Sequence, residues 1–168
     1  GQRYDSCLTG VHLKDLFSLK EQIYEKVKDI DGNVIIKEYP TKSASTSTIR
    51  AHLDKLKQQG VPIDMIIVDY GDLLKPVNAP RGNEKRHDLE SIYEELRAIA
   101  QVCECPVWTA SQTNRSGLNA ELITMEAISE SFNKCFVADF IFSLSRTITD
   151  KAKNRGKIFI AKNRNEIG

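Results

Sequence analysis

Met65-Ile66-Ile67-Val68-Asp69-Tyr70 is an unbroken apolar run that ends in a carboxylate and leads into Gly71-Asp72. Such a run predicts a strand that is buried on both faces. An acid at the end of this strand lies at the carboxyl edge of a parallel sheet, where open α/β folds bind ligands. In a nucleotide-hydrolysing domain, that acid holds the water shell of Mg²⁺. A strand that ends in an ordinary turn gives the same pattern, because Asp also starts turns, so Asp69 alone leaves both interpretations open.

Length and composition predict a globular domain without a membrane span. The 168 residues suffice for one domain with a hydrophobic core, and a formal net charge of +1 argues neither for nor against a nucleic-acid partner. The sequence has no apolar run of about eighteen residues and no signal peptide, so we expect a cytoplasmic protein. No zinc-site spacing occurs, and we expect reduced thiols at all four cysteines, Cys7, Cys103, Cys105 and Cys135.

Helix and strand patterns alternate along the chain, which predicts an α/β fold with a largely parallel sheet. Helical spacing of apolar residues predicts helices over 13–30, 49–56, 89–103 and 125–133. Strands are expected at 34–36, 65–70, 106–110, 140–144 and 157–161, and a basic loop over 146–155 separates the last two. Ser47 is the expected N-cap of the second helix, and Gly60 is its expected C′ glycine.

Two further segments at strand ends carry side chains suited to phosphate chemistry. Gln112 follows the strand expected at 106–110, where a neutral amide can position an attacking water or sense a γ-phosphate. Lys162 and Arg164 stand at alternating positions after the last strand, so they project to one side and suit contact with a phosphate, also across a subunit boundary. Polar turns and solvated basic tails give the same patterns, so each segment alone also fits a role without chemistry.

Four stretches occur in a recognisable order on this α/β frame. They are Ile67-Val68-Asp69-Tyr70, Pro106-Val107 leading into Ser111-Gln112-Thr113-Asn114-Arg115, Ala138-Asp139, and Lys162-Asn163-Arg164-Asn165. From about Val34 onward, the chain resembles the C-terminal RecA-like ATPase domain of DnaB-type hexameric replicative helicases, including their phage members. The resemblance implies a RecA-like fold, with a mostly parallel sheet flanked by helices and antiparallel strands at the C-terminal end. It also implies that residues 1–168 form a single, partial domain.

The resemblance also implies roles for individual residues. Asp69 corresponds to the Walker B acid that supports Mg²⁺ through water, and Gln112 to the glutamine that senses the γ-phosphate. Lys162 and Arg164 correspond to the basic pair that reaches the ATP of a neighbouring subunit. In the parent protein, the implied activity is ATP hydrolysis that drives translocation on single-stranded DNA and duplex unwinding. The implied cofactors are ATP and Mg²⁺, and the implied assembly is a hexameric ring.

Nucleic-acid contacts are expected in several loops. Ser129-Glu130-Ser131 occupies the place of the family's Arg-Glu-Ser-Gly loop, which meets single-stranded DNA, although Phe132 stands where the family has Gly. Arg86 and Arg115 belong to basic loops that would form a funnel for a phosphate backbone if the loops converge. Gly71-Asp72 is a further departure, because the family usually has Leu-Gln at these positions.

The chain contains neither a G-x-x-x-x-G-K-[S/T] phosphate loop nor a match to the family's catalytic glutamate. We therefore expect a fragment, cut after the phosphate loop of its parent and inactive on its own. Two alternatives remain open: a RecA-like recombination or clock-type ATPase without unwinding activity, and a non-catalytic RecA-like assembly module. Gln112, Lys162 and Arg164 favour the helicase over the module, because a scaffold needs none of them.

Overall fold

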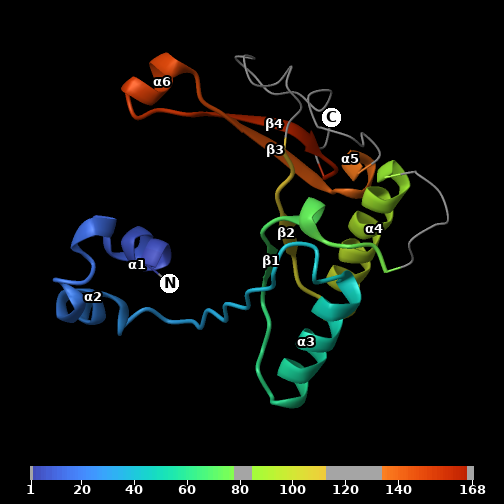
Figure 1. Ribbon diagram of the computed structural model, residues 1–168, viewed down its shortest axis with the longest axis horizontal. Helices are drawn as coiled ribbons and strands as arrows, with labels where there is room; N and C mark the ends of the chain where they lie inside the picture. The colour runs from blue at the N-terminus through green and yellow to red at the C-terminus, as the bar shows by residue number, and fades with distance from the viewer. Residues whose placement is uncertain (1, 78–84, 113–133, 166–168) are drawn as a thin grey trace. The chain divides into compact units, whose positions relative to one another are not determined.

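The computed structural model describes residues 2–77, 85–112 and 134–165, with residues 85–87 described by their backbone only. The chain divides into two compact units, residues 1–38 and 39–168 (Figure 1). Among the described helices, none is long and apolar enough to cross a membrane. The prediction of one domain over the whole chain stays a prediction. All four cysteines are free in this structure.

The first unit contains three short helical segments: α1 (Gln2–Thr9), the 3-10 helix η1 (Leu13–Asp15) and α2 (Lys20–Val27). The single helix predicted over 13–30 is therefore wrong in its first half. There, the Ser18 hydroxyl donates to the Asp15 carbonyl at 2.9 Å, a local bond that competes with the helical pattern. A long-range bond from Lys26 Nζ to the Thr9 carbonyl, 2.9 Å, ties α2 to the end of α1.

The short strand predicted at 34–36 is also wrong, because this segment is irregular. Its side chains are largely exposed, at 66% for Val34, 46% for Ile35 and 57% for Ile36. A strand needs a neighbouring strand for its backbone hydrogen bonds, and none of the described strands pairs with this segment.

In the second unit, α3 (Thr46–Gln58) begins and ends with specific capping motifs. Ser45, not Ser47, is the N-cap: its hydroxyl accepts from the backbone N–H of Thr48, while the Thr48 hydroxyl accepts from the backbone N–H of Ser45. At the other end, Gly60 has φ +71° and donates to the Lys57 carbonyl, while the N–H of Val61 donates to the Leu56 carbonyl. This pair of bonds is a Schellman motif, which confirms the predicted C′ glycine.

The core of this unit lies between α3, the long helix α4 (Lys85–Cys103) and the parallel strand pair β1 (Ile66–Val68) and β2 (Val107–Thr109). One face of α4 supplies the most deeply buried apolar side chains, Ile92, Leu96 and Ile99, at 2%, 3% and 1% exposure. They pack with the apolar side chains Leu53 and Ile66. Helical spacing thus predicted both the existence and the buried face of α4.

Described residues cover the two faces of the β1–β2 pair unequally. Ile66 is 8% exposed, whereas its neighbour Ile67 is 66% exposed, because successive residues of a strand face opposite sides. The predicted burial of β1 on both faces is therefore wrong for the described part of the chain.

The C-terminal part is an antiparallel ribbon of β3 (Phe140–Ser145) and β4 (Lys157–Asn163), as predicted. The connecting segment, predicted as a loop, contains the short helix α6 (Ile148–Ala152), which lies at the tip of the ribbon (Figure 1). Thr147 and Asp150 form a capping box that starts α6. Helix α5 (Lys134–Val137) precedes β3, and the helix expected over 125–133 lies outside the described residues.

Candidate nucleotide site at the carboxyl edge of the sheet

The structure brings the predicted Asp69 and Gln112 to the same edge of the sheet. Since β1 and β2 are parallel, their carboxyl ends meet at one edge, and both residues follow these ends. Gln112 Nε2 donates to the hydroxyl of Tyr70, the residue next to Asp69, at 2.9 Å. The Asp69 side chain is exposed and has no hydrogen-bond or ion-pair partner among the described residues. An exposed, unpaired carboxylate at this edge fits a hard cation held through water.

Thr109 connects the two strand ends directly. Its hydroxyl donates to the Val68 carbonyl at 2.9 Å and accepts from the backbone N–H of Gly71 at 2.8 Å. Gly71 is buried, and a Cβ added there would lie 3.2 Å from Thr109 Oγ1 and 3.3 Å from the Tyr93 ring. Glycine at position 71, where the family usually has Leu, therefore permits the close approach of the segments that carry Gly71, Tyr93 and Thr109.

A buried polar cluster lies directly behind this edge, and we call Asp72, Tyr93, Ser111 and Lys134 the Asp72 cluster. The Tyr93 hydroxyl donates to Asp72 Oδ1 at 2.8 Å, and the Ser111 hydroxyl donates to Asp72 Oδ2 at 2.9 Å. Lys134 Nζ lies 3.2 and 3.3 Å from these two oxygens and donates to Ser111 Oγ at 2.6 Å. The Lys134 side chain is 2% exposed and that of Asp72 is 18% exposed.

Electrostatics keep the Tyr93 phenol of this cluster protonated. Burial, followed by the negative charge of Asp72 and its hydrogen bond, raises the pKa of the Tyr93 phenol far above its ordinary value. Tyr93 therefore stays a hydrogen-bond donor. Lys134 Nζ also lies 5.5 Å from the centroid of the Tyr93 ring, so a cation–π contact adds to the ion pair.

The sequence did not predict the Asp72 cluster. Asp72 stood out only as a departure from the family pattern, and Lys134 was not singled out at all. One available signal is the segment Lys134-Cys135-Phe136-Val137, in which a single cation begins an apolar stretch and therefore needs a buried partner.

Lys162 and Arg164 lie on one side of β4 and its extension, as their alternation predicted. Lys162 Nζ donates to the carbonyls of Cys135 and Phe136 at 2.9 and 3.1 Å. Arg164 donates to the Phe136 carbonyl at 3.0 Å and pairs with Asp139 at 2.5 Å. Burial, and then the neighbouring Arg164, lower the pKa of Lys162. Both cations are thus held by their own chain in this structure.

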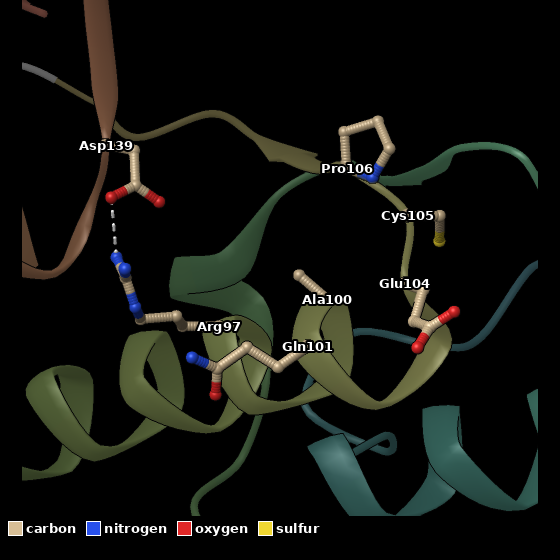
Figure 2. Close-up of a pocket in the computed structure, with 7 residues that line it drawn as sticks. All are labelled: Arg97, Ala100, Gln101, Glu104, Cys105, Pro106 and Asp139. Carbon is tan, nitrogen blue, oxygen red and sulfur yellow. Dashed lines mark hydrogen bonds and ion pairs between the residues drawn. The ribbon is translucent and has the colours of Figure 1, made fainter. Parts of the chain in front are cut away.

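A separate open pocket of about 320 Å³ lies at the other end of β2, where Pro106 precedes the strand (Figure 2). Figure 2 shows Arg97 of α4 pointing toward Asp139, and the two side chains form an ion pair of 2.9 Å. This pocket is therefore distinct from the edge that carries Asp69 and Gln112.

The predicted nucleic-acid residues are not tested by the structure. Arg115 and Ser129-Glu130-Ser131 lie outside the described residues, and Arg86 is described only by its backbone in α4. Within the described ranges, no three His, Cys, Asp or Glu side chains gather as metal ligands. A water-mediated contact to a single acid, as predicted for Asp69, needs no such cluster.

Comparisons with solved structures define the class of fold. The chain superposes on the "ATPase Domain of G40P" with a TM-score of 0.76 and 17% identity, covering 98% of this chain and 62% of that one. It also superposes on a chain of "The Structure Of A DnaB-Like Replicative Helicase And Its Interactions With Primase", with the same TM-score and identity, covering 43% of that chain. The predicted RecA-like fold is confirmed.

Sequence comparison then defines the family. Residues 7–167 match the family model described as the DnaB-like helicase C terminal domain. The chain is also 35% identical over 119 residues to a DnaB-like replicative helicase of Enterobacteria phage T4. The chain belongs to the DnaB-like helicase C-terminal domain family, as its motifs predicted. The match covers 69% of this chain and 25% of the phage helicase, so the chain spans about a quarter of that relative's length.

Proposed function

We propose that this chain is part of the ATP-hydrolysing motor of a replicative DNA helicase that translocates on single-stranded DNA and unwinds duplex. The observation that carries the proposal is the meeting of Asp69 and Gln112 at one sheet edge, where Gln112 contacts the residue next to Asp69. The helicase relative in phage T4 favours this function over a recombination or clock-type ATPase.

In this proposal, the residues at the edge have separate tasks. Asp69 holds the water shell of Mg²⁺, and when bound, Mg²⁺ neutralises charge on the phosphates of ATP. Gln112 donates an amide hydrogen bond toward the γ-phosphate or the attacking water. Its contact with the Tyr70 hydroxyl holds the amide beside Asp69 in the absence of nucleotide.

Lys162 and Arg164 act on the ATP of an adjacent subunit in a hexameric ring. The Arg164 side chain is 44% exposed and uses two of its guanidinium nitrogens in the contacts described. A guanidinium carries five N–H donors in a planar fork, so donors remain for two phosphate oxygens. Contact with Asp139 and the Phe136 carbonyl would hold this fork in place before the subunits meet.

The sequence has no phosphate loop, and that loop normally supplies most protein contacts to the phosphates. We therefore expect no ATP hydrolysis from this chain by itself, and the activity is to be measured in the full-length helicase.

The proposal is tested by Asp69→Asn in the full-length helicase. We expect kcat for ATP hydrolysis to fall by on the order of 10²-fold or more, since contacts to a catalytic metal are worth several kcal/mol. Folding should survive because the side chain is exposed. The matched control is Asp64→Asn, which makes the same change at an exposed position before β1, at the opposite end of the strand. Near-normal ATPase activity of Asp69→Asn would remove the basis of the proposal.

A further inference from the structure

The Asp72 cluster connects the two strand ends that the proposed function uses. Asp72 lies in the 3-10 turn η2 (Gly71–Leu73) that follows Asp69, and Ser111 is the residue directly before Gln112. Lys134 contacts both Asp72 and Ser111. We propose that Lys134 is a positioning residue, which holds Asp69 and Gln112 at the separation that ATP hydrolysis requires. This inference rests on the proposed function.

Both oxygens of the largely buried Asp72 carboxylate have partners in the cluster. Each oxygen of Asp72 accepts one hydroxyl hydrogen bond, from Tyr93 or from Ser111, and each also lies within 3.3 Å of Lys134 Nζ. A buried ion pair of this kind adds little net stability compared with apolar side chains of similar volume, because desolvation offsets the attraction. What it does provide is a fixed arrangement, because each bond holds two of the four segments that carry Asp72, Tyr93, Ser111 and Lys134 in one relative placement.

The path from Lys134 to Gln112 runs through Ser111. The Ser111 hydroxyl accepts from Lys134 at 2.6 Å and donates to Asp72 at 2.9 Å, so both neighbours determine where this backbone segment lies. Gln112 then contacts Tyr70 at 2.9 Å, which closes a loop of contacts back to Asp69. Loss of the ammonium leaves Asp72 without its cation and Ser111 without one of its two hydrogen-bond partners. A displacement of about 1 Å in such a constellation costs about 10²-fold in rate.

A Ser–Lys pair also occurs where serine is a nucleophile, but the contacts here do not fit that chemistry. The Ser111 hydroxyl donates its single proton to Asp72, and the Lys134 ammonium is paired with the same carboxylate. With 2% of its side chain exposed, Lys134 also leaves no access for a ligand. The arrangement therefore positions other residues and does not react itself.

The test uses the full-length helicase with three substitutions and a control. Lys134→Met removes the charge, Lys134→Arg keeps it, and Ser111→Ala cuts the path to Gln112 while leaving the ion pair in place. Lys57→Met makes the same change as the first at an exposed position of α3. We expect Lys134→Met to lower kcat about 10²-fold while KM for ATP changes little. Ser111→Ala should lower kcat about tenfold or more, because it removes the hydroxyl that bonds to both Lys134 and Asp72. Lys134→Arg should recover part of the loss, and Lys57→Met should match the wild type.

Amide hydrogen exchange provides a second readout that does not depend on ATPase activity. Lys134→Met should increase exchange over residues 69–72 and 110–112 relative to Lys57→Met. A folded Lys134→Met variant with kcat within twofold of the wild type, or with unchanged exchange in both segments, would overturn the inference. If Lys134→Met does not fold, an unchanged kcat and unchanged exchange in Ser111→Ala overturn it equally. A wild-type helicase without ATPase activity would instead contradict the proposed function, and the exchange data would still decide the role of Lys134.

Discussion

Gln112 offers the clearest single-residue test of coupling between nucleotide and DNA. In the full-length helicase, Gln112→Ala should lower the stimulation of ATPase activity by single-stranded DNA about tenfold, which lies within ordinary coupling free energies of about 1–3 kcal/mol. ATP affinity should change less, because a residue that senses the γ-phosphate contributes mainly after the ground state has formed. Steady-state ATPase assays with and without DNA, beside nucleotide titrations, measure both quantities.

The matched control is Gln58→Ala, which truncates an exposed glutamine in the last turn of α3. A Gln112→Ala variant that loses ATP affinity but keeps full DNA stimulation would make Gln112 a simple binding residue.

The position of a single residue could be predicted from sequence where the residue lies close to the end of a recognisable strand. That Asp69 and Gln112 lie at the same sheet edge could be predicted because Asp69 directly follows β1, Gln112 lies shortly after β2, and parallel strands bring their ends together. The Asp72 cluster was not predictable, because Lys134 stands 62 residues after Asp72 and no local pattern relates the two. Its members come from separate turns, strand ends and helices that meet only in the folded chain.

At the level of elements, two substitutions at the N-terminus of α3 distinguish the N-cap seen in the structure, Ser45, from the one predicted from sequence, Ser47. Ser45→Ala should lower the free energy of unfolding by about 1 kcal/mol, since it removes the hydroxyl that accepts from the backbone N–H of Thr48 and leaves this N–H without its cap. Ser47→Ala, at the position predicted from sequence, is exposed and within the helix and should change stability by less than about 0.5 kcal/mol. Urea unfolding of both variants measures the difference, and equal effects would contradict the assigned cap.

Sequence predicted correctly the elements that have a long apolar pattern or that find their pairing partner nearby in the sequence. The apolar stripe of α4 and the paired strands β3 and β4 meet this condition. The segment 34–36 does not, since β-branched residues favour a strand only where a partner strand is available, and no described strand pairs with it. The cap of α3 was misplaced because several hydroxyl residues stand in a row at 45–48, and only the reciprocal bonds select one of them.

At the level of the whole molecule, the proposed function puts the chemistry at an interface between subunits. The chain belongs to the DnaB-like helicase C-terminal domain family and spans about a quarter of its phage T4 relative. In the proposed ring, Asp69 serves the ATP of its own subunit, whereas Arg164 serves that of a neighbour. The two residues then belong to different active sites although they stand on one chain.

Mixed rings test this central claim most directly. Subunits with Asp69→Asn are mixed with subunits with Arg164→Ala, and ATPase activity is compared with that of rings made from either variant alone. If Arg164 acts in trans, some interfaces combine an intact Asp69 with an intact Arg164, and the mixture recovers part of the wild-type rate, while each pure variant stays defective. Loss of a single arginine finger alone typically costs about 10³–10⁵ in rate, so recovery would stand out clearly. A mixture no more active than the pure variants would contradict the account, because every site would then contain a defect of its own chain.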